Sequence, residues 1–187
     1  MKTIAVYCGS STGHDSIYMQ EAKKLGQTLV ANGLNLVYGG AAVGCMGAVA
    51  DGVIEAGGKA IGVIPKKLKD VEIAHQNLTD LHVVDTMHER KALMMDYADA
   101  FIAFPGGSGT LEEWFEVFTW AQLGYHQKAC ALHNVNDYYT PMLSLFDHMI
   151  EQGFVKPAYK DLIVMEDDAD TLINKLKNYE HQAIQKW

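Results

Sequence analysis

The feature that most constrains the fold is an alternation that runs along the whole chain. Short apolar or β-branched runs, typical of buried strands, alternate with longer segments of helical periodicity. Strands are predicted at Thr3–Cys8, Leu34–Tyr38, Lys59–Ile64, Leu81–Val84, Ala100–Phe104, Lys128–Leu132 and Leu162–Met165. Helices are predicted at Ser16–Ala31, Met46–Ala56, Met87–Ala98, Leu111–Leu123, Tyr139–Gln152 and Ala169–Tyr179. Because parallel strands need crossover helices, this pattern predicts an α/β fold: one domain, residues 1–187, with a doubly wound parallel sheet of about seven strands.

Composition and charge exclude several classes of function. The formal net charge is −8, whereas nucleic-acid-binding proteins usually carry a basic surface, so we expect no nucleic-acid partner. No apolar run approaches the roughly 20 residues of a membrane span, and the N-terminal segment lacks a secretory signal pattern, so we expect a cytoplasmic protein without a membrane partner. The cysteines are expected to be buried, reduced thiols, and the absence of CxxC and HExxH motifs predicts no metal site.

Three glycine-rich segments each follow a predicted strand. They span residues 9–13, 39–44 and 105–110. One such segment is often only a tight turn, but ligands of parallel sheets bind beyond the carboxyl ends of the strands, which is where all three lie. The three segments together therefore indicate a binding site at that edge of the sheet.

The glycine loops do not match the patterns of the common nucleotide cofactors. A dinucleotide site needs GxGxxG after the first strand and an acidic residue at the end of the second. The first loop has glycine only at positions 9 and 13, and the second strand ends in Tyr38-Gly39-Gly40. The GxxxxGK[ST] motif of nucleotide triphosphatases is also absent. The remaining interpretation is a Rossmann-like sheet whose loops hold a mononucleotide.

The segment after Phe104 is the strongest candidate for holding its phosphate. The backbone amides around its glycines can approach an anion closely, Ser108 and Thr110 add hydroxyl groups, and the helix predicted from Leu111 contributes its N-terminal dipole. An alternative stays open for Glu113. Thr110 and Glu113 have the spacing of a capping box, in which Glu113 would serve the helix terminus and not a ligand.

The helix predicted at Met87–Ala98 carries two basic residues, Arg90 and Lys91, within its apolar arc. An unpaired buried charge is costly, so a basic pair on a packing face favours an anionic partner. The alternative is that both side chains extend along the surface to reach solvent. Thr86 and Glu89 form a predicted capping box that marks the start of this helix.

Two motifs in register resemble one known family. They are Met87-His88-Glu89-Arg90-Lys91 and Pro105-Gly106-Gly107-Ser108-Gly109-Thr110-Leu111-Glu112-Glu113, which matches the signature PGGxGTxxE. The chain resembles the LOG ("lonely guy") family of cytokinin riboside 5′-monophosphate phosphoribohydrolases over nearly its whole length. The resemblance implies a Rossmann-like homodimer without a cofactor. It also implies hydrolysis of adenosine-type 5′-monophosphates, cytokinin nucleotides or AMP, to free base and ribose 5-phosphate.

The same resemblance implies which residues form the site. The catalytic residues fall on Arg90 and Glu113. The purine nucleotide contacts fall on Glu72, Lys91, Gly106, Gly107, Ser108, Gly109, Thr110, Leu111, Glu112 and Thr119. Relatives have often been labelled lysine decarboxylases, but nothing in the sequence marks a lysine that would form a Schiff base. Ser108 stands where larger residues are expected in several members, which bears on substrate preference and not on the chemistry.

Cleavage of an N-glycosidic bond passes through an oxocarbenium-like sugar cation. A carboxylate near C1′ can stabilise that charge and position or deprotonate water, a role that suits Glu113. Arg90 would anchor the substrate or stabilise the departing purine. The rival hypothesis is a nucleotide or cofactor carrier on the same fold, which would need the glycine loops but not both Arg90 and Glu113.

The same two helices carry many large apolar residues, including Met94, Met95, Trp114, Phe115, Phe118 and Trp120. Some of these residues are predicted to form a two-fold interface near the site.

Overall fold

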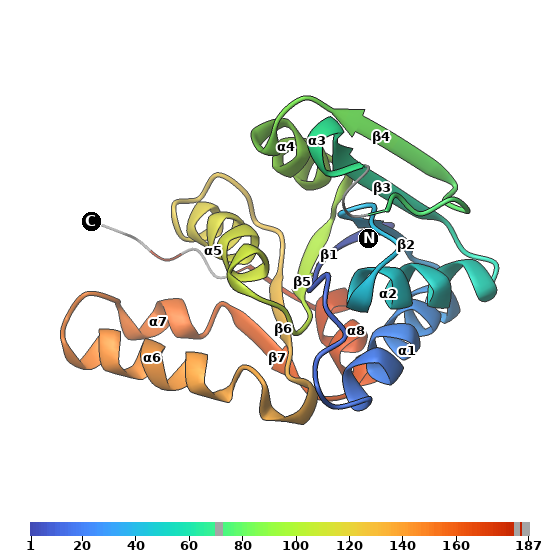
Figure 1. Ribbon diagram of the computed structural model, residues 1–187. Helices are drawn as coiled ribbons and strands as arrows, with labels where there is room; N and C mark the ends of the chain where they lie inside the picture. Colours follow the sequence, from blue (N-terminus) through green and yellow to red (C-terminus); the bar gives the residue numbers. More distant parts are fainter. Residues whose placement is uncertain (70–72, 182–183, 185–187) are drawn as a thin grey trace.

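A computed structural model describes residues 1–69, 73–181 and 184 of the chain (Figure 1). Its strands form a single seven-stranded sheet, and every pairing in it is parallel. The strands are β1 (Thr3–Tyr7), β2 (Asn35–Tyr38), β3 (Ala60–Pro65), β4 (Asp80–Val84), β5 (Ala100–Ala103), β6 (Cys130–His133) and β7 (Ile163–Glu166). All seven predicted strands are therefore confirmed, with ends that differ by a residue or two.

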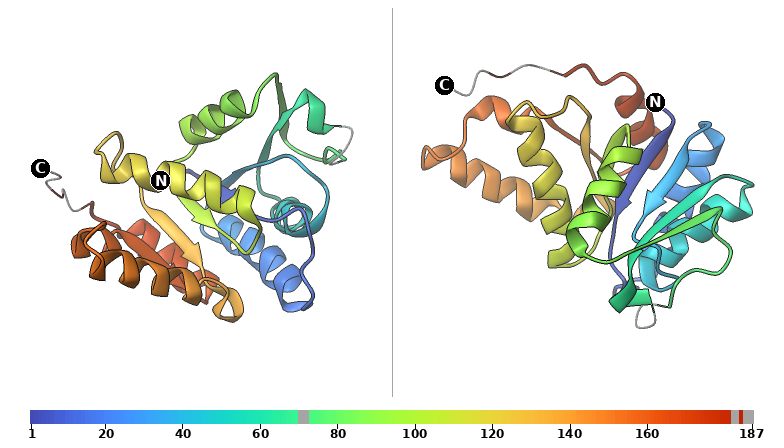
Figure 2. Two further views of the ribbon diagram at one scale, coloured as in Figure 1. Left: turned by 60° about the vertical axis from the view of Figure 1, so that its left-hand side comes forward. Right: turned by 90° about the horizontal axis from the view of Figure 1, so that it is seen from above.

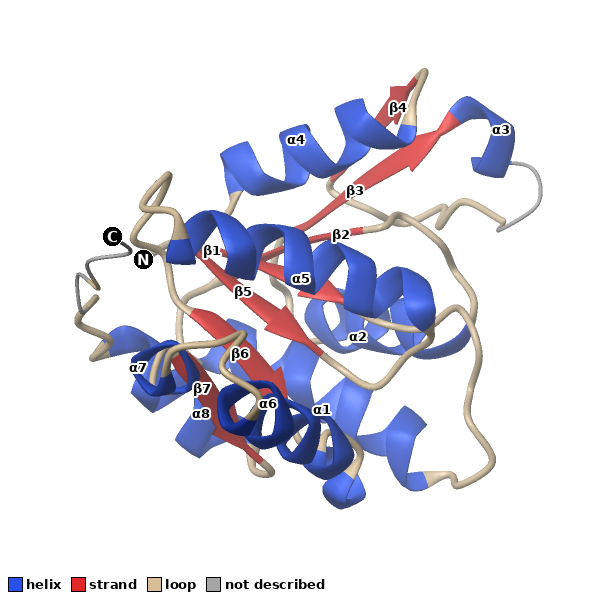
Figure 3. Cartoon of the chain, turned by 90° about the vertical axis from the view of Figure 1, so that its left-hand side faces the viewer, coloured by secondary structure: helices blue, strands red, loops and turns tan. Residues whose placement is uncertain are grey.

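The helices cover both faces of the sheet, as a doubly wound fold requires (Figures 1 and 3). They are α1 (Ile17–Ala31), α2 (Gly44–Glu55), α3 (Lys66–Lys69), α4 (Met87–Tyr97), α5 (Ser108–Gln122), α6 (Thr140–Glu151), α7 (Pro157–Lys160) and α8 (Ala169–Lys177), with a 3-10 turn η1 (Val135–Asp137). All six predicted helices are present. The sequence pattern missed the short elements α3, α7 and η1, because four residues or fewer show no periodicity.

Helices pack on both faces of the sheet (Figure 2), and an apolar layer lies between sheet and helices on each face. One lies between the sheet and helices α1, α2 and α8, and includes Leu25, Val49 and Leu172. The other lies between the sheet and helices α4, α5 and α6, and includes Met94 and Trp114. None of the helices in the described residues is long and apolar enough to cross a membrane.

The strand order is β4-β3-β2-β1-β5-β6-β7, so the direction of winding reverses at β1. The chain builds outward from β1 through β4 on one side, then returns to β5 on the other side. At this reversal the loops after β1 and β5 diverge to opposite faces, which opens a crevice at their carboxyl ends. The topology therefore places the binding site beside Cys8–Ser10 and residues 105–110.

Two sequence-based expectations about α5 are wrong. The helix begins at Ser108, with Gly107 as its N-cap, three residues earlier than predicted. Thr110 is therefore inside the first turn, and the predicted Thr110–Glu113 capping box cannot form there. The capping box of α4 is confirmed, since Thr86 Oγ1 accepts from Glu89 N–H and Glu89 accepts from Thr86 N–H.

Of the six apolar residues among which a dimer contact is predicted, three lie in the core of the monomer and three do not. Met94, Trp114 and Phe118 are 0–1% exposed and belong to the core of the monomer, so they cannot contact a second chain. Met95 and Phe115 are half-buried, and Trp120 is 39% exposed. The periodicity of an apolar face does not distinguish the side that meets the sheet from the side that meets a partner.

Candidate active site

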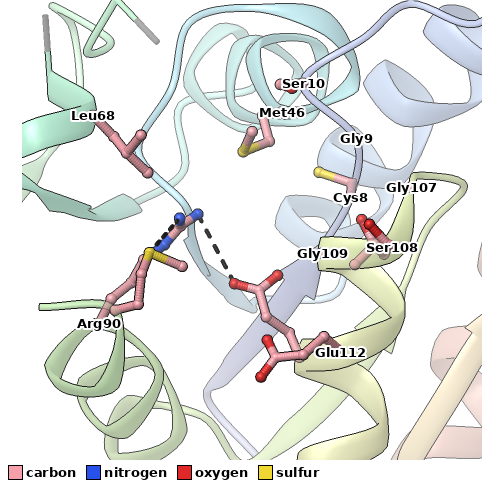
Figure 4. A pocket seen from close by; sticks show the side chains of 13 residues that line it. Cys8, Gly9, Ser10, Met46, Leu68, Arg90, Gly107, Ser108, Gly109 and Glu112 are labelled. Carbon is pink, nitrogen blue, oxygen red and sulfur yellow. Dashed lines mark hydrogen bonds and ion pairs between the residues drawn. The ribbon is translucent and has the colours of Figure 1, made fainter. Parts of the chain in front are cut away.

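A pocket of about 300 Å³ opens at the carboxyl ends of β1 and β5 (Figure 4). Its wall combines five sections of the chain: the end of β1 with the loop that follows it, the start of α2, the short helix α3, the first turn of α4, and the N-terminal part of α5. The residues that line it are Cys8, Gly9, Ser10, Met46, Leu68, Met87, Arg90, Gly107, Ser108, Gly109, Thr110, Glu112 and Glu113. The site is therefore at the crevice that the strand order creates.

Arg90 and Glu113 both line this pocket and form a loose ion pair in its wall. Arg90 is 6% exposed and Glu113 is 8% exposed, and Arg90 Nη2 lies 4.0 Å from Glu113 Oε1. Burying one charge alone would be costly, and the opposite charge of the neighbour offsets that cost. The expectation that Arg90 is a buried cation with an anionic neighbour is thus confirmed, and the surface alternative is wrong.

The N-terminus of α5 forms the second part of the site. Its N-cap is Gly107, which has no side chain that could accept from the first backbone N–H groups of the helix. Backbone N–H groups at an uncapped helix start point outward and favour an anion, and the helix dipole adds to this preference. Ser108 and Gly109 are exposed at this end, so the terminus is open to a ligand.

Lys91 extends toward α5 and does not itself line the pocket. Its ammonium lies 2.5 Å from Glu112 Oε1 and 3.1 Å from Glu116 Oε2. Burial acts to lower the pKa of Lys91, but the two glutamates outweigh it and the pKa is raised. Lys91 therefore links α4 to α5 through ion pairs with Glu112 and Glu116.

Cys8 lines the pocket but is unsuited to act as a nucleophile. Burial raises the pKa of its thiol well above the ordinary value, and the charges of Cys45 and Glu113 add to this effect. A thiol with a raised pKa carries almost no thiolate at neutral pH. The three cysteines are all buried and free, as expected.

The structure brings most of the predicted site residues together. Arg90, Glu113, Glu112 and residues 107–110 share the pocket, and Gly106 lines an adjoining cavity behind it. Leu111 instead packs against the apolar layer, and Thr119 is exposed two turns further along α5. Glu72 lies outside the described residues.

Sequence reasoning missed the apolar wall of the pocket. Met46, Leu68 and Met87 come from three different helices. Met46 and Leu68 lie outside both motifs, and Met87 opens the first motif but is not among the predicted site residues. Sequence reasoning also missed Tyr138, which lines the adjoining cavity of about 360 Å³ and donates a hydrogen bond to Gly106 O at 2.7 Å. In the described residues, no group of three His, Cys, Asp or Glu side chains is placed to hold a metal ion.

Comparisons with known proteins find relatives that match most of the chain. A family model described as "Possible lysine decarboxylase" matches residues 46–176. The chain is 45% identical, over 95% of its length and 90% of the relative's, to a cytokinin riboside 5′-monophosphate phosphoribohydrolase of Rhodococcoides fascians. It is 46% identical to an enzyme of the same name from Arabidopsis thaliana, over 95% of this chain and 78% of that one.

Solved structures share the fold at much lower identity. A molybdenum cofactor binding protein from Rippkaea orientalis matches with a TM-score of 0.73 and 22% identity, over 95% of this chain and 96% of that chain. The molybdenum cofactor carrier protein of Chlamydomonas reinhardtii matches with a TM-score of 0.71 and 20% identity, over the same shares. At this identity the likeness extends to the fold alone.

Proposed function

Because this chain belongs to the LOG family, we propose that it hydrolyses the N-glycosidic bond of an adenosine-type nucleoside 5′-monophosphate to free base and ribose 5-phosphate. The observation that carries the proposal is the meeting of Arg90 and Glu113 in one pocket beside the uncapped start of α5. This arrangement supplies a carboxylate, a cation and an anion site within the length of one nucleotide.

The substrate fits this pocket in one orientation. The 5′-phosphate is bound by the backbone amides and hydroxyls of residues 106–110, where the helix terminus favours an anion. C1′ then lies near Glu113, and the purine lies against the apolar wall of Met46, Leu68 and Met87. The predicted nucleotide contacts of Glu72, Lys91, Leu111, Glu112 and Thr119 stay predictions from the family resemblance.

Glu113 and Arg90 act at opposite ends of the breaking bond. As the C1′–N9 bond breaks, its electron pair stays on the purine and positive charge develops on the ribose, which the Glu113 carboxylate stabilises. Glu113 also orients the attacking water. The hydroxyl of this water bonds to C1′, and its proton ends on the released base. Arg90 stabilises the negative charge that develops on the purine or anchors the substrate.

The carrier hypothesis and the decarboxylase description are both less well supported. A carrier has no use for a carboxylate opposite an arginine at the centre of its pocket. A Schiff-base lysine needs a lowered pKa, whereas the pKa of Lys91 is raised by Glu112 and Glu116.

The chain also presents a surface suited to self-association. A groove of about 640 Å³ at the C-terminal ends of α4 and α5 is lined in part by Met95, Trp120 and Tyr125. We propose that a second copy of the chain covers this face in a homodimer. The cytoplasmic location stays a prediction of the sequence.

One experiment tests the reaction. Chelator-treated protein is incubated with AMP, N6-substituted AMP analogues, adenosine and lysine, and the products are separated by chromatography. We expect free base from the monophosphates, far less from adenosine, and no product from lysine. A site built for a phosphate penalises a ligand without one. Absence of free base from every monophosphate would refute the hydrolase, and equal kcat/KM for adenosine and AMP would refute the phosphate site.

A further inference from the structure

The guanidinium of Arg90 occupies space that a side chain at Gly39 would fill. Gly39 follows β2 directly and lies next to the Arg90 side chain of α4. A methyl group on Gly39 would lie 2.0 Å from Arg90 Nη2, 3.2 Å from Arg90 Cζ and 2.9 Å from Met46 Sδ. Carbon and nitrogen atoms without a bond do not approach to 2.0 Å, so the position of the guanidinium depends on the absence of a side chain at Gly39.

The contacts of Arg90 with Met87 and Glu113 are weak. Arg90 Nη1 donates to Met87 Sδ at 3.9 Å, and a thioether sulfur is a weak acceptor. Arg90 Nη2 lies 4.0 Å from Glu113 Oε1, which exceeds the length of an ordinary N–H···O hydrogen bond. Arg90 Nε is buried and has no hydrogen-bond partner in the described part of the chain. The shape of the surrounding wall therefore does more than hydrogen bonding to set where the guanidinium lies.

From these contacts we infer that Gly39 is a positioning residue for the reaction. The absence of a side chain on Gly39 leaves the space in which the Arg90 guanidinium lies, close to Glu113 and the substrate. The inference rests on the proposed role of Arg90. It explains why a glycine stands at this end of β2, where no phosphate-binding motif requires one.

Gly39 differs from the glycines that serve the fold. A methyl group on Gly26 or Gly47 would lie 2.2–2.3 Å from a backbone oxygen, of Val49 or Ala42, which cannot move cheaply. At Gly39 the nearest atoms are instead the ends of two flexible side chains. Gly39 is also absent from the residues with positive φ, so alanine there meets no backbone strain. Gly39→Ala should therefore fold, with the guanidinium displaced.

The first test compares two glycine substitutions. For Gly39→Ala we expect kcat/KM for AMP to fall by about 10²-fold, as a misplaced catalytic group does, with a nearly unchanged Tm. Gly58→Ala is the matched control, because a methyl group there would lie 2.3 Å from the stiff Val30 side chain, away from the pocket. Gly58→Ala should lose stability and keep its kcat/KM. Wild-type kcat/KM in Gly39→Ala would overturn the inference.

The second test asks whether Gly39 acts through Arg90. If it does, Gly39→Ala should cause no further loss of kcat/KM in an Arg90→Ala background. A further loss would show that the methyl group obstructs the substrate itself, and would overturn the inference.

A crystal structure of Gly39→Ala tests the inference independently of the proposed function. We expect the Arg90 guanidinium to leave this space, and a guanidinium that stays in place would overturn the inference whatever the activity. Full activity of Arg90→Ala would instead refute the proposed role of Arg90. The crystal structure of Gly39→Ala would still show whether Gly39 determines the position of the guanidinium.

Discussion

At the scale of single residues, we expect the function to depend on one carboxylate. Glu113 is buried in the pocket wall and lies 4.0 Å from Arg90. Neighbouring carboxylates are placed differently: Glu112 is largely exposed, and Glu116 pairs with Lys91 at 3.1 Å. Glu113 is therefore the acidic residue of α5 that is both desolvated and directed at the site.

The substitution Glu113→Gln tests this role. Gln keeps the size of the side chain but supplies neither a negative charge nor a base, so we expect kcat to fall by at least about 10²-fold. KM should change far less, because the phosphate is bound elsewhere. Because α5 begins at Ser108, no helix cap is lost and the protein should remain folded. Steady-state kinetics beside a thermal melt measure both effects.

Glu116→Gln is the control on the same helix. It removes a contact to Lys91 but nothing that lines the pocket, so kcat should stay near that of the wild type. Near-normal kcat in Glu113→Gln would contradict the assignment and direct attention to Glu112 or Glu72.

At the scale of elements, the proposed phosphate-binding loop, residues 105–110, is held by the connection between β6 and α6. Tyr138 O–H donates to Gly106 O at 2.7 Å, and Tyr139 O–H donates to Phe104 O at 2.9 Å. The described residues contain no cis peptide bond, and the C=O and N–H of a trans peptide point in opposite directions. By holding the Gly106 carbonyl, Tyr138 therefore directs the Gly107 N–H away from itself.

Loss of this hydrogen bond should weaken phosphate binding. Flanked by two glycines, the Gly106–Gly107 peptide is free to turn once Tyr138 O–H is removed. We expect Tyr138→Phe to raise KM for AMP about fivefold, equivalent to about 1 kcal/mol for one hydrogen bond, with little change in kcat. The low kcat/KM for adenosine should not change.

Tyr125→Phe is the matched control, because Tyr125 is 76% exposed and does not line the phosphate site. It should behave as the wild type with both substrates. Equal losses for AMP and adenosine in Tyr138→Phe would show a general structural role in place of a phosphate-specific one.

Sequence patterns were sufficient for the order and type of the main elements. Strand runs and helical periodicity depend on local composition, so all seven strands and six helices could be predicted. The start of α5 could not, because Gly107 has no side chain that signals an N-cap. The burial of Arg90 could be inferred from its place in an apolar arc. The close approach of Arg90 to Gly39 could not be inferred, because the two residues are far apart in the sequence and meet only in the fold.

At the scale of the whole molecule, the exposed apolar surface predicts how copies associate. Trp120, Leu123 and Tyr125 are 39%, 42% and 76% exposed and follow one another at the end of α5. Exposed clusters of this kind commonly mark protein–protein contacts. The face continues to Met95 of α4, so the proposed two-fold contact would join the two helices that carry Arg90 and Glu113.

Light scattering tests the homodimer. We expect a mass of twice 20.6 kDa for the wild type at micromolar concentration. Trp120→Asp should give the monomer mass, because a buried unpaired charge opposes association. Phe154→Asp is the control at another exposed apolar residue, 85% exposed, and should leave the dimer intact. A monomeric wild type would refute the proposed assembly, and dissociation by Phe154→Asp alone would move the interface to that face.

The stability of the whole molecule should depend on the protonation of one histidine. His133, on β6, is 0% exposed, and its Nε2–H donates to Asp167 O at 3.1 Å. Its Nδ1 is buried without a partner in the described residues, so a second proton there would find no acceptor. Burial, with the charge of Lys24 adding, outweighs Asp167 and Asp168 and lowers the pKa of His133 from 6.5 to about 4.

The direction of the pH effect follows from this lowered pKa. Between pH 6.5 and about pH 4 the unfolded chain binds a proton at His133 that the folded chain does not bind. The contribution of the neutral histidine to stability is therefore complete above pH 6.5 and is lost as the pH falls toward 4. For a shift of this size the free energy of unfolding should fall by about 2 kcal/mol between pH 7.5 and pH 5.

Urea unfolding at fixed protein concentration, at pH 7.5 and pH 5, measures this loss. His133→Gln retains an N–H donor but does not titrate, so its loss between the two pH values should be smaller by about 2 kcal/mol. His148→Gln is the control, because His148 has a side chain that is 66% exposed and should leave the pH dependence unchanged. If His133→Gln loses as much stability as the wild type on acidification, another group must carry the effect. His126 would then be the next to substitute, because burial also lowers its pKa.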